Sequence, residues 1–123
     1  MGKLTDRRAL VLGGDLGTAV ARALEAAGAR VAVADASVAR ARSAAEAAQA
    51  ICVDQPTDTV EHTEAAVGQA ADALGGLDVL VTLPSRPVLG GIGDTPPDQW
   101  EAALKADLHR VYAACRAAAR PMM

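Results

Sequence analysis

Aromatic side chains are scarce in this chain of 123 residues, which contains one Trp, one Tyr and no Phe. Apolar residues nevertheless make up 51% of the sequence. The core must therefore be built from Ala, Val and Leu, and such small side chains favour helices packed closely against a sheet. Alanine-rich helical segments alternate with Val- and Leu-rich strands, which indicates an α/β architecture.

Positive charge and long apolar runs are also scarce. The net charge of −3 and the pI near 5.2 argue against a nucleic-acid surface, because phosphate contacts need clustered Lys and Arg. No apolar run approaches the roughly 18 residues of a membrane span, and the first residues contain no signal-peptide core. The sequence therefore predicts a cytoplasmic protein with neither a nucleic-acid nor a membrane partner.

Side chains that commonly carry chemistry are few and isolated. Cys52 and Cys115 each lie within an apolar pattern, which favours buried free thiols over a disulfide or a nucleophile. Neither His62 nor His109 has a second ligand four residues on, so both are interpreted as surface residues rather than metal ligands. Ser85 lacks the flanking glycines of a nucleophile elbow and is expected in a loop.

The most informative stretch is a glycine turn between an apolar run and a helical pattern. The run 9–12 has the length of a buried strand and leads directly into Gly13-Gly14-Asp15-Leu16-Gly17. Residues with helical apolar spacing follow at once, and this arrangement presents backbone N–H groups to a phosphate. The candidate cofactor-binding residues of the turn are Gly13, Gly14, Leu16 and Gly17.

Two acidic residues end predicted strands. Asp35 follows the apolar run 29–34, about 20 residues after the turn, where a carboxylate can accept hydrogen bonds from the adenosine ribose. The same carboxylate would repel a 2′-phosphate, which favours NAD over NADP. Asp35 could instead cap the helix that follows. Asp54 ends the next short strand, at the sheet edge where open parallel sheets bind ligands.

Strands and helices alternate along the whole chain. We predict strands over 8–12, 30–34, 50–53 and 77–83, and helices over 17–27, 37–48, 58–74 and 95–120. The third helix is predicted to begin with a capping box made by Asp58 and Glu61. The last helix is predicted to start at Thr95 as the cap, with Pro96 at the first helical position.

The last predicted helix carries one strong apolar face. Its members recur at intervals of four, four, three and four residues: Trp100, Leu104, Leu108, Val111 and Cys115. A loop rich in Pro and Gly, residues 84–93, precedes the helix and lies where a substrate would arrive.

These motifs resemble the short-chain dehydrogenase/reductase family from Leu4 to Met123, over the amino-terminal half of that family's domain. The family's Thr-Gly-x-x-x-Gly-x-Gly motif falls on residues 12–19, where two glycines match, and its two strand-end acids fall on Asp35 and Asp54. The phrase from Gly75 to Val81 is similar to the lead-in to the family's Asn-Asn-Ala-Gly motif.

The resemblance implies one domain over residues 1–123 with a Rossmann-like fold. We expect three αβα layers, a parallel sheet in the strand order 3-2-1-4, and truncation after the fourth helix. The family transfers a hydride between a nicotinamide and a carbonyl or alcohol carbon, with a tyrosine, a lysine and a serine in the catalytic roles. None of these three can be placed within the chain.

Several positions depart from the family pattern. Residues 82–85 read Thr-Leu-Pro-Ser in place of Asn-Asn-Ala-Gly, and the family's catalytic asparagine falls on Asp107, for which a structural role is favoured. Tyr112 and Arg116 imitate a Tyr-x-x-x-Lys pair but lie on the preceding helix. An arginine, moreover, cannot relay a proton as a lysine can.

Two classes of function stay open on this evidence. The chain is either a dinucleotide-binding half of a dehydrogenase-type domain, or a non-catalytic scaffold that has kept the apolar skeleton. The second class is motivated by departures at ligand-facing positions such as Leu12, Asp15 and Ala19. The fourth strand would be an open edge, so a second copy or a complementing chain is expected to bind there and at the last helix.

Overall fold

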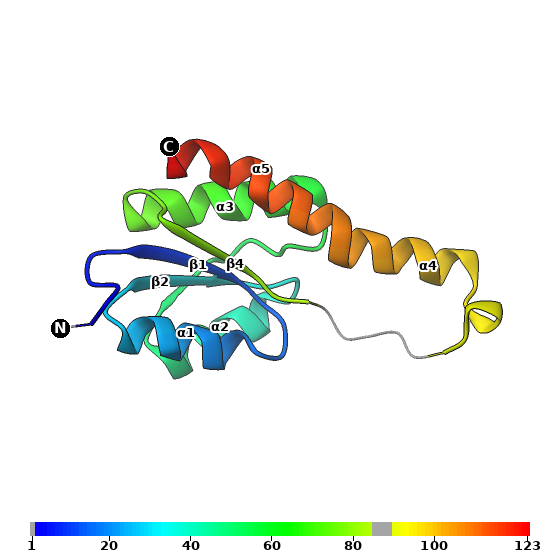
Figure 1. Ribbon diagram of the computed structural model, residues 1–123, viewed down its shortest axis with the longest axis horizontal. Helices are drawn as coiled ribbons and strands as arrows, with labels where there is room; N and C mark the ends of the chain where they lie inside the picture. The colour runs from blue at the N-terminus through cyan, green and yellow to red at the C-terminus, as the bar shows by residue number, and fades with distance from the viewer. Residues whose placement is uncertain (1, 85–89) are drawn as a thin grey trace.

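The computed structural model describes residues 2–84 and 90–123 and contains one parallel sheet (Figure 1). Its strands are β1 (Arg8–Leu12), β2 (Arg30–Ala34), β3 (Ile51–Cys52) and β4 (Val79–Thr82). They pair in the order β3-β2-β1-β4, with every neighbouring pair parallel. The predicted α/β class and strand order are confirmed.

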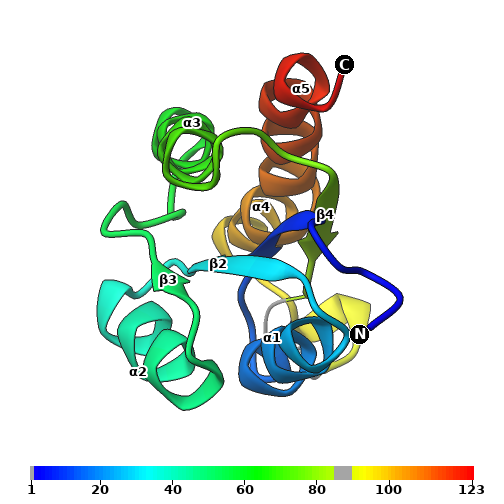
Figure 2. The same ribbon diagram turned by 90° about the vertical axis from the view of Figure 1, so that its left-hand side faces the viewer.

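Helices cover both faces of the sheet. They are α1 (Gly17–Ala26), α2 (Val38–Ala48), α3 (Val60–Leu74), α4 (Pro97–Leu104) and α5 (Arg110–Met122). Helices α1 and α2 lie on one face, and α3 and α5 lie on the other, which gives the predicted three layers (Figure 2). None of the helices in the described ranges has the length and apolar character needed to cross a membrane.

The core is divided by β1, which is buried on both faces. Leu10 and Leu12 belong to the cluster under α3 and α5, whereas Ala9 and Val11 belong to the cluster under α1 and α2. Alternate side chains of a strand point to opposite faces, so a strand covered on both sides has to be apolar throughout. On the helices the buried positions are mostly alanines, which lets the layers approach closely.

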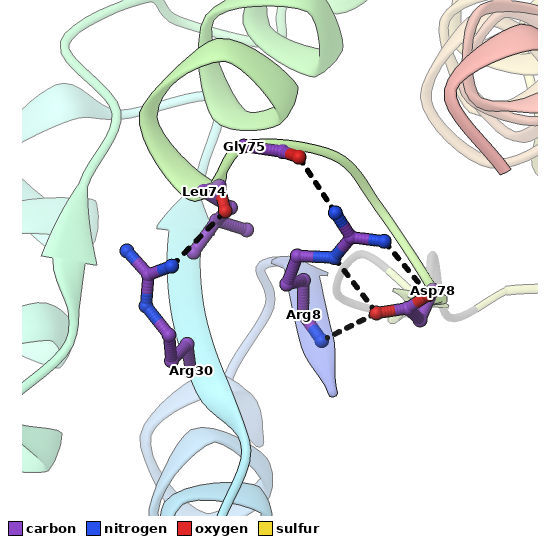
Figure 3. Close-up of polar contacts among 5 residues, drawn as sticks. All are labelled: Arg8, Arg30, Leu74, Gly75 and Asp78. Carbon is purple, nitrogen blue, oxygen red and sulfur yellow. Dashed lines mark hydrogen bonds and ion pairs between the residues drawn. The ribbon is translucent and has the colours of Figure 1, made fainter. Parts of the chain in front are cut away.

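The amino ends of β1 and β4 are joined by a set of polar contacts that we call the amino-edge clasp: Arg8, Arg30, Leu74, Gly75 and Asp78 (Figure 3). Arg8 donates to both oxygens of Asp78, from Nε at 2.9 Å and from Nη2 at 3.1 Å. The backbone N–H of Arg8 also donates to this carboxylate at 2.9 Å. Hydrogen bonds from Arg8 lower the pKa of Asp78 from 3.8 to about 2.

The same guanidinium ties the end of α3 to the clasp. Arg8 Nη1 donates to the carbonyl oxygen of Gly75 at 2.6 Å, and Arg30 Nη1 donates to that of Leu74 at 3.1 Å. These carbonyls lie at the carboxyl end of a helix, where acceptors lack an intrahelical partner and a positive charge is favourable. The clasp therefore fixes β1, β4 and the α3–β4 connection to one another.

Two predicted helix starts are wrong by one or two residues. Thr59, not Asp58, caps α3, because its Oγ1 accepts from the backbone N–H of His62 at 3.0 Å. Asp58 lies one residue too early for that bond and contacts the His62 ring at 2.6 Å instead. At α4 the cap is Pro96, with Pro97 at the first helical position.

The Thr95 hydroxyl donates to the carbonyl oxygen of Gly91 at 3.0 Å and so does not cap α4. The last helix also ends later than predicted, since α5 includes Pro121 and finishes at Met122. A proline in the last turn removes only one intrahelical hydrogen bond, and the helix can continue through it.

Most of the apolar face predicted for the last helix lies on the surface. Trp100 is 58% exposed, Leu108 is 60% exposed, and Cys115 is also on the surface. A π-helical turn, η2 (Lys105–His109), separates α4 from α5. Helix α4 projects beyond the sheet (Figure 1), and neither α4 nor η2 has a buried residue, so the apolar side chains in these two segments have little to pack against. The residues that α5 buries are Arg110, Ala113, Ala114 and Ala118.

The cysteines differ in their surroundings. Cys52 is half-buried at the end of β3, and its burial, followed by the nearby Asp54 carboxylate, raises the pKa of its thiol. Cys115 lies on the exposed side of α5, so the prediction of a buried thiol is wrong there. Both cysteines are free.

Candidate functional site

The Gly13-Gly14 turn at the carboxyl end of β1 packs too tightly for side chains. The backbone N–H of Gly13 donates to the carbonyl oxygen of Ala34 at 2.7 Å, which holds the turn against the end of β2. A Cβ at Gly13 would collide with Oδ2 of Asp35, and one at Gly14 would lie 2.7 Å from the carbonyl oxygen of Pro84. Glycine is thus required at both positions by close approach.

The start of α1 is open. Leu16, the N-cap residue of α1, makes no side-chain capping hydrogen bond, whereas Ser37 caps α2 and Thr59 caps α3. A Cβ placed on Gly17, the first residue of α1, would have no neighbour within 4 Å. The positive end of the helix dipole therefore faces space next to the glycine turn, an arrangement that suits an anion.

Asp35 lies at the carboxyl end of β2 and is only 5% exposed. Its Oδ1 accepts from the backbone N–H of Ser37 at 2.9 Å and from Arg40, at 3.1 Å from Nε and 2.8 Å from Nη2. Ser37 caps α2, so the alternative that Asp35 is a plain helix cap is wrong. These bonds orient the carboxylate toward the turn, and the Arg40 charge offsets its own.

A cavity of about 370 Å³ lies at this edge of the sheet, between the glycine turn, the end of β2, the start of α3 and the α4–η2–α5 rod. A second cavity of about 370 Å³ adjoins the turn on the α1 and α2 side. Gly13, Gly14 and Asp35 line both, and Gly17 lines the second. Volumes of this size are typical of small-molecule sites.

Two predicted site residues lie outside these cavities. Leu16 precedes α1 with its side chain largely exposed, and Asp54 is an exposed carboxylate that pairs with Arg42 at 3.4 Å. Neither lines either cavity. The structure therefore brings together Gly13, Gly14, Gly17 and Asp35, while the roles of Leu16 and Asp54 stay predictions.

The first cavity is also lined by side chains that the sequence analysis did not name as binding residues. Arg40, Thr57, Lys105 and Arg110 all line the first cavity. Arg40 follows Asp35 by five residues, a spacing from which a contact could have been suspected. No such signal in the sequence pointed to Arg110, because a charged residue in a helical pattern is expected to be solvated. In the structure Arg110 is only 8% exposed.

The remaining candidates lie away from the cavity or outside the described residues. Tyr112 is exposed on α5, and Arg116 contacts Glu64 at 3.3 Å rather than facing the sheet edge. Asp107 and His109 are exposed residues of η2. Ser85 lies outside the described residues. Within residues 2–84 and 90–123, no three His, Cys, Asp or Glu side chains gather closely enough to hold a metal ion.

Comparisons with known proteins agree with this geometry. The family model described as short chain dehydrogenase matches residues 7–123. A search among curated proteins found no match.

Among solved structures, a short-chain dehydrogenase/reductase from Serratia marcescens is 30% identical, with a TM-score of 0.87. A short chain dehydrogenase from Burkholderia cenocepacia, solved in complex with NADP, is 33% identical with a TM-score of 0.86. In both comparisons the match covers 97% of this chain and 52% of the other. The chain therefore spans about half the length of these solved relatives.

Proposed function

This chain belongs to the short-chain dehydrogenase family, and from that premise we propose that it binds a nicotinamide dinucleotide at the Gly13-Gly14 turn. The observation that carries the proposal is the convergence of the glycine turn, the open space at Gly17 where α1 begins, and Asp35 beside the two cavities. The turn and α1 would receive the diphosphate, and Asp35 would accept hydrogen bonds from the adenosine ribose. Leu16 and Asp54 complete the proposed binding set.

Asp35 is the basis for proposing NAD as the preferred cofactor. A carboxylate at the ribose repels a 2′-phosphate, but Arg40 donates two N–H groups to the same oxygen. The guanidinium is more than half exposed and is available to a second anion. We therefore propose a modest preference for NAD over NADP. The NADP bound to the Burkholderia relative supports nicotinamide dinucleotides as the ligand class.

In this family the bound nicotinamide supplies the centre that gives or takes a hydride. The described residues of this chain would bind and orient the dinucleotide, with the packed glycine turn holding its position. The resemblance assigns acid–base chemistry to a tyrosine, a lysine and a serine that the sequence does not supply between residues 1 and 123. Hydride transfer would therefore require those groups from residues beyond this range or from another chain.

Calorimetric titration of the chain with NAD+ and NADP+ tests the binding proposal. The sharpest variant is Gly17→Val, since a Cβ there meets open space in the protein and would occupy the space proposed for the diphosphate. Gly68→Val on α3 is the matched control, because its Cβ also has no neighbour within 4 Å. We expect both variants to stay folded and only Gly17→Val to lose cofactor. No heat and no thermal shift at millimolar cofactor would reject the proposal.

A second candidate function is a scaffold or a complementing half that pairs with another chain. The observation that favours it is β4, an edge strand in the described sheet whose four residues are all only partly buried. Leu108 and Tyr112 are exposed on the neighbouring helical rod. Light scattering after size exclusion tests this candidate: pairing predicts a dimer that Leu108→Glu weakens, whereas a monomer at high concentration counts against it.

A further inference from the structure

Two buried polar groups beside the first cavity have no hydrogen-bond partner. Thr57 is 2% exposed and Arg110 is 8% exposed, and both residues line this cavity. Thr57 Oγ1 and Arg110 Nε contact no acceptor or donor among the described residues. Because buried polar groups are nearly always hydrogen-bonded, the two orphaned atoms at one cavity call for a common explanation.

The charges around this cavity are unevenly satisfied. Asp35 is paired with Arg40 at 2.8 Å, and Asp58 contacts the ring of His62 at 2.6 Å. Arg110, in contrast, donates a single side-chain hydrogen bond to the described residues, from Nη2 to the carbonyl oxygen of Leu83 at 2.8 Å. That carbonyl is neutral and satisfies one of the five N–H donors of a guanidinium. A buried cation is therefore held at the cavity wall without a carboxylate partner among the described residues.

The π-helical turn explains why a second cation reaches the same cavity. Lys105 and Arg110 are five residues apart, and both line it. In an α-helix that spacing separates two side chains by about 140° around the axis, so they could not share one wall. In a π-helix residues i and i+5 are brought together by their hydrogen bond. Because η2 spans Lys105–His109, both cations lie on the side that faces the glycine turn.

We propose that Thr57, Lys105 and Arg110 form a second binding wall for the phosphate groups of a ligand, opposite the Gly13-Gly14 turn. This inference rests on the proposed function, in which the phosphates are those of a dinucleotide. The guanidinium and the ammonium supply charge-assisted donors to phosphate oxygens, and the Thr57 hydroxyl supplies one more donor. The turn and the wall hold the phosphates from two sides.

Three variants test the wall, each for a different reason. Arg110→Met removes the buried cation while keeping an unbranched apolar stem. Lys105→Ala removes an exposed cation and is expected to leave the fold intact. Thr57→Val keeps the side-chain shape and removes only the hydroxyl that lacks a partner, so it should preserve or raise the thermal stability while weakening the ligand. A purely structural role for Thr57 would not give that combination.

The probes are NAD+, inorganic pyrophosphate and adenosine, titrated by NMR chemical shift against the full chain. We expect Arg110→Met and Lys105→Ala each to weaken NAD+ and pyrophosphate by about tenfold, because each removes a charge-assisted hydrogen bond. Adenosine binding should not change. Arg116→Ala is the matched control, since Arg116 lies on the same helix but pairs with Glu64, away from the cavity. It should leave all three probes unaffected.

The outcomes separate this proposal from the proposed function. If NAD+ binding depends on Gly17 but is unchanged in Lys105→Ala and Thr57→Val, the wall is overturned while dinucleotide binding stands. If NAD+ and adenosine fail to bind but pyrophosphate binding is lost in Lys105→Ala, the dinucleotide is overturned and the phosphate wall stands. Should Arg110→Met fail to fold, the same two criteria apply to Lys105→Ala and Thr57→Val. If the wild-type chain binds neither pyrophosphate nor NAD+, both proposals are overturned.

Discussion

An arginine lies at each edge of the sheet, but the hydrogen bonds of the two arginines differ. At the amino edge, Arg8 and Asp78 form a bidentate pair, and Nη1 of Arg8 donates to the backbone carbonyl of Gly75 (Figure 3). At the carboxyl edge, Arg110 is buried with an orphaned Nε next to a cavity. One edge is closed by its own hydrogen bonds, and the other leaves donors for something else.

This contrast separates stabilising polar contacts from functional ones. A polar group that is fully bonded within the protein contributes to stability and offers little to a ligand. A buried donor without a partner lowers stability, and a ligand that supplies the acceptor regains that loss as binding free energy. Arginine by itself is therefore uninformative about function, and its hydrogen-bond partners are what distinguish Arg8 from Arg110.

The largest effect is expected from adding a side chain at the glycine turn of the carboxyl edge. Gly13→Ala introduces a Cβ that would collide with the Asp35 carboxylate and lie 3.1 Å from the Ala34 carbonyl oxygen. We expect a loss of about 1–3 kcal/mol of unfolding free energy, as is usual for overpacking, together with loss of NAD+ binding. Urea unfolding and calorimetry measure the two effects. Gly68→Ala, whose Cβ meets open space, should show neither.

A smaller effect is expected from removing the Arg8–Asp78 ion pair at the amino edge. Asp78 has its pKa lowered from 3.8 to about 2 by Arg8, so its contribution to stability is fully present above about pH 4. This contribution is lost as the pH falls from about 4 to 2. Asp78→Asn should lower Tm by a few degrees at neutral pH without altering cofactor binding. In a plot of Tm against pH, the variant should also show a smaller fall in Tm between about pH 4 and 2, the acid limb of the plot. An unchanged acid limb would contradict this account.

Asp72→Asn is the control for the amino edge. Asp72 is an exposed carboxylate of α3 outside the clasp, so its variant should keep the wild-type acid limb. If both variants changed the limb equally, the effect would reflect net charge rather than the clasp.

The smallest effect is expected from removing Arg40, the exposed partner of Asp35 at the carboxyl edge. Arg40→Ala removes the charge that offsets Asp35, so NADP+ should be repelled more strongly and the NAD+ preference should rise by about fivefold. Stability should change little, because the Arg40 side chain is more than half exposed. Dissociation constants for NAD+ and NADP+ give the ratio directly. A fall in the ratio would show that Asp35 does not face the ribose.

Several of the wrong predictions concern the segment formed by α4, η2 and α5. A spacing of four, four, three and four residues predicts a continuous apolar face, but that inference assumes an unbroken α-helix. The π-helical turn from Lys105 to His109 changes which residues share a side. Lys105 and Arg110, five residues apart, both line the cavity. Trp100 and Leu108 are exposed because α4 and η2 bury none of their residues against the sheet. No residue pattern in this stretch distinguishes a π turn from an α turn.

The glycine turn and Asp35 were predictable because their signals are local. A strand, a glycine bend and a helix follow one another directly in the sequence, and the second strand places its terminal acid at the same edge. The contacts that give this edge its charge are not local. Arg110 lies 27 residues after Leu83, whose carbonyl oxygen it contacts, and nearly a hundred after the turn it faces.

The sequence by itself determined the order of strands and helices, the parallel sheet and the position of the glycine turn. Each of these depends on apolar spacing and on residues close to one another in the chain, so the pattern carries the information. Only the tertiary structure decided that each guanidinium nitrogen of Arg8 has an acceptor, while the buried Nε of Arg110 has none among the described residues. The physical reason is that a hydrogen-bond partner or a burial depth is set by segments distant in sequence, which meet only when the layers pack.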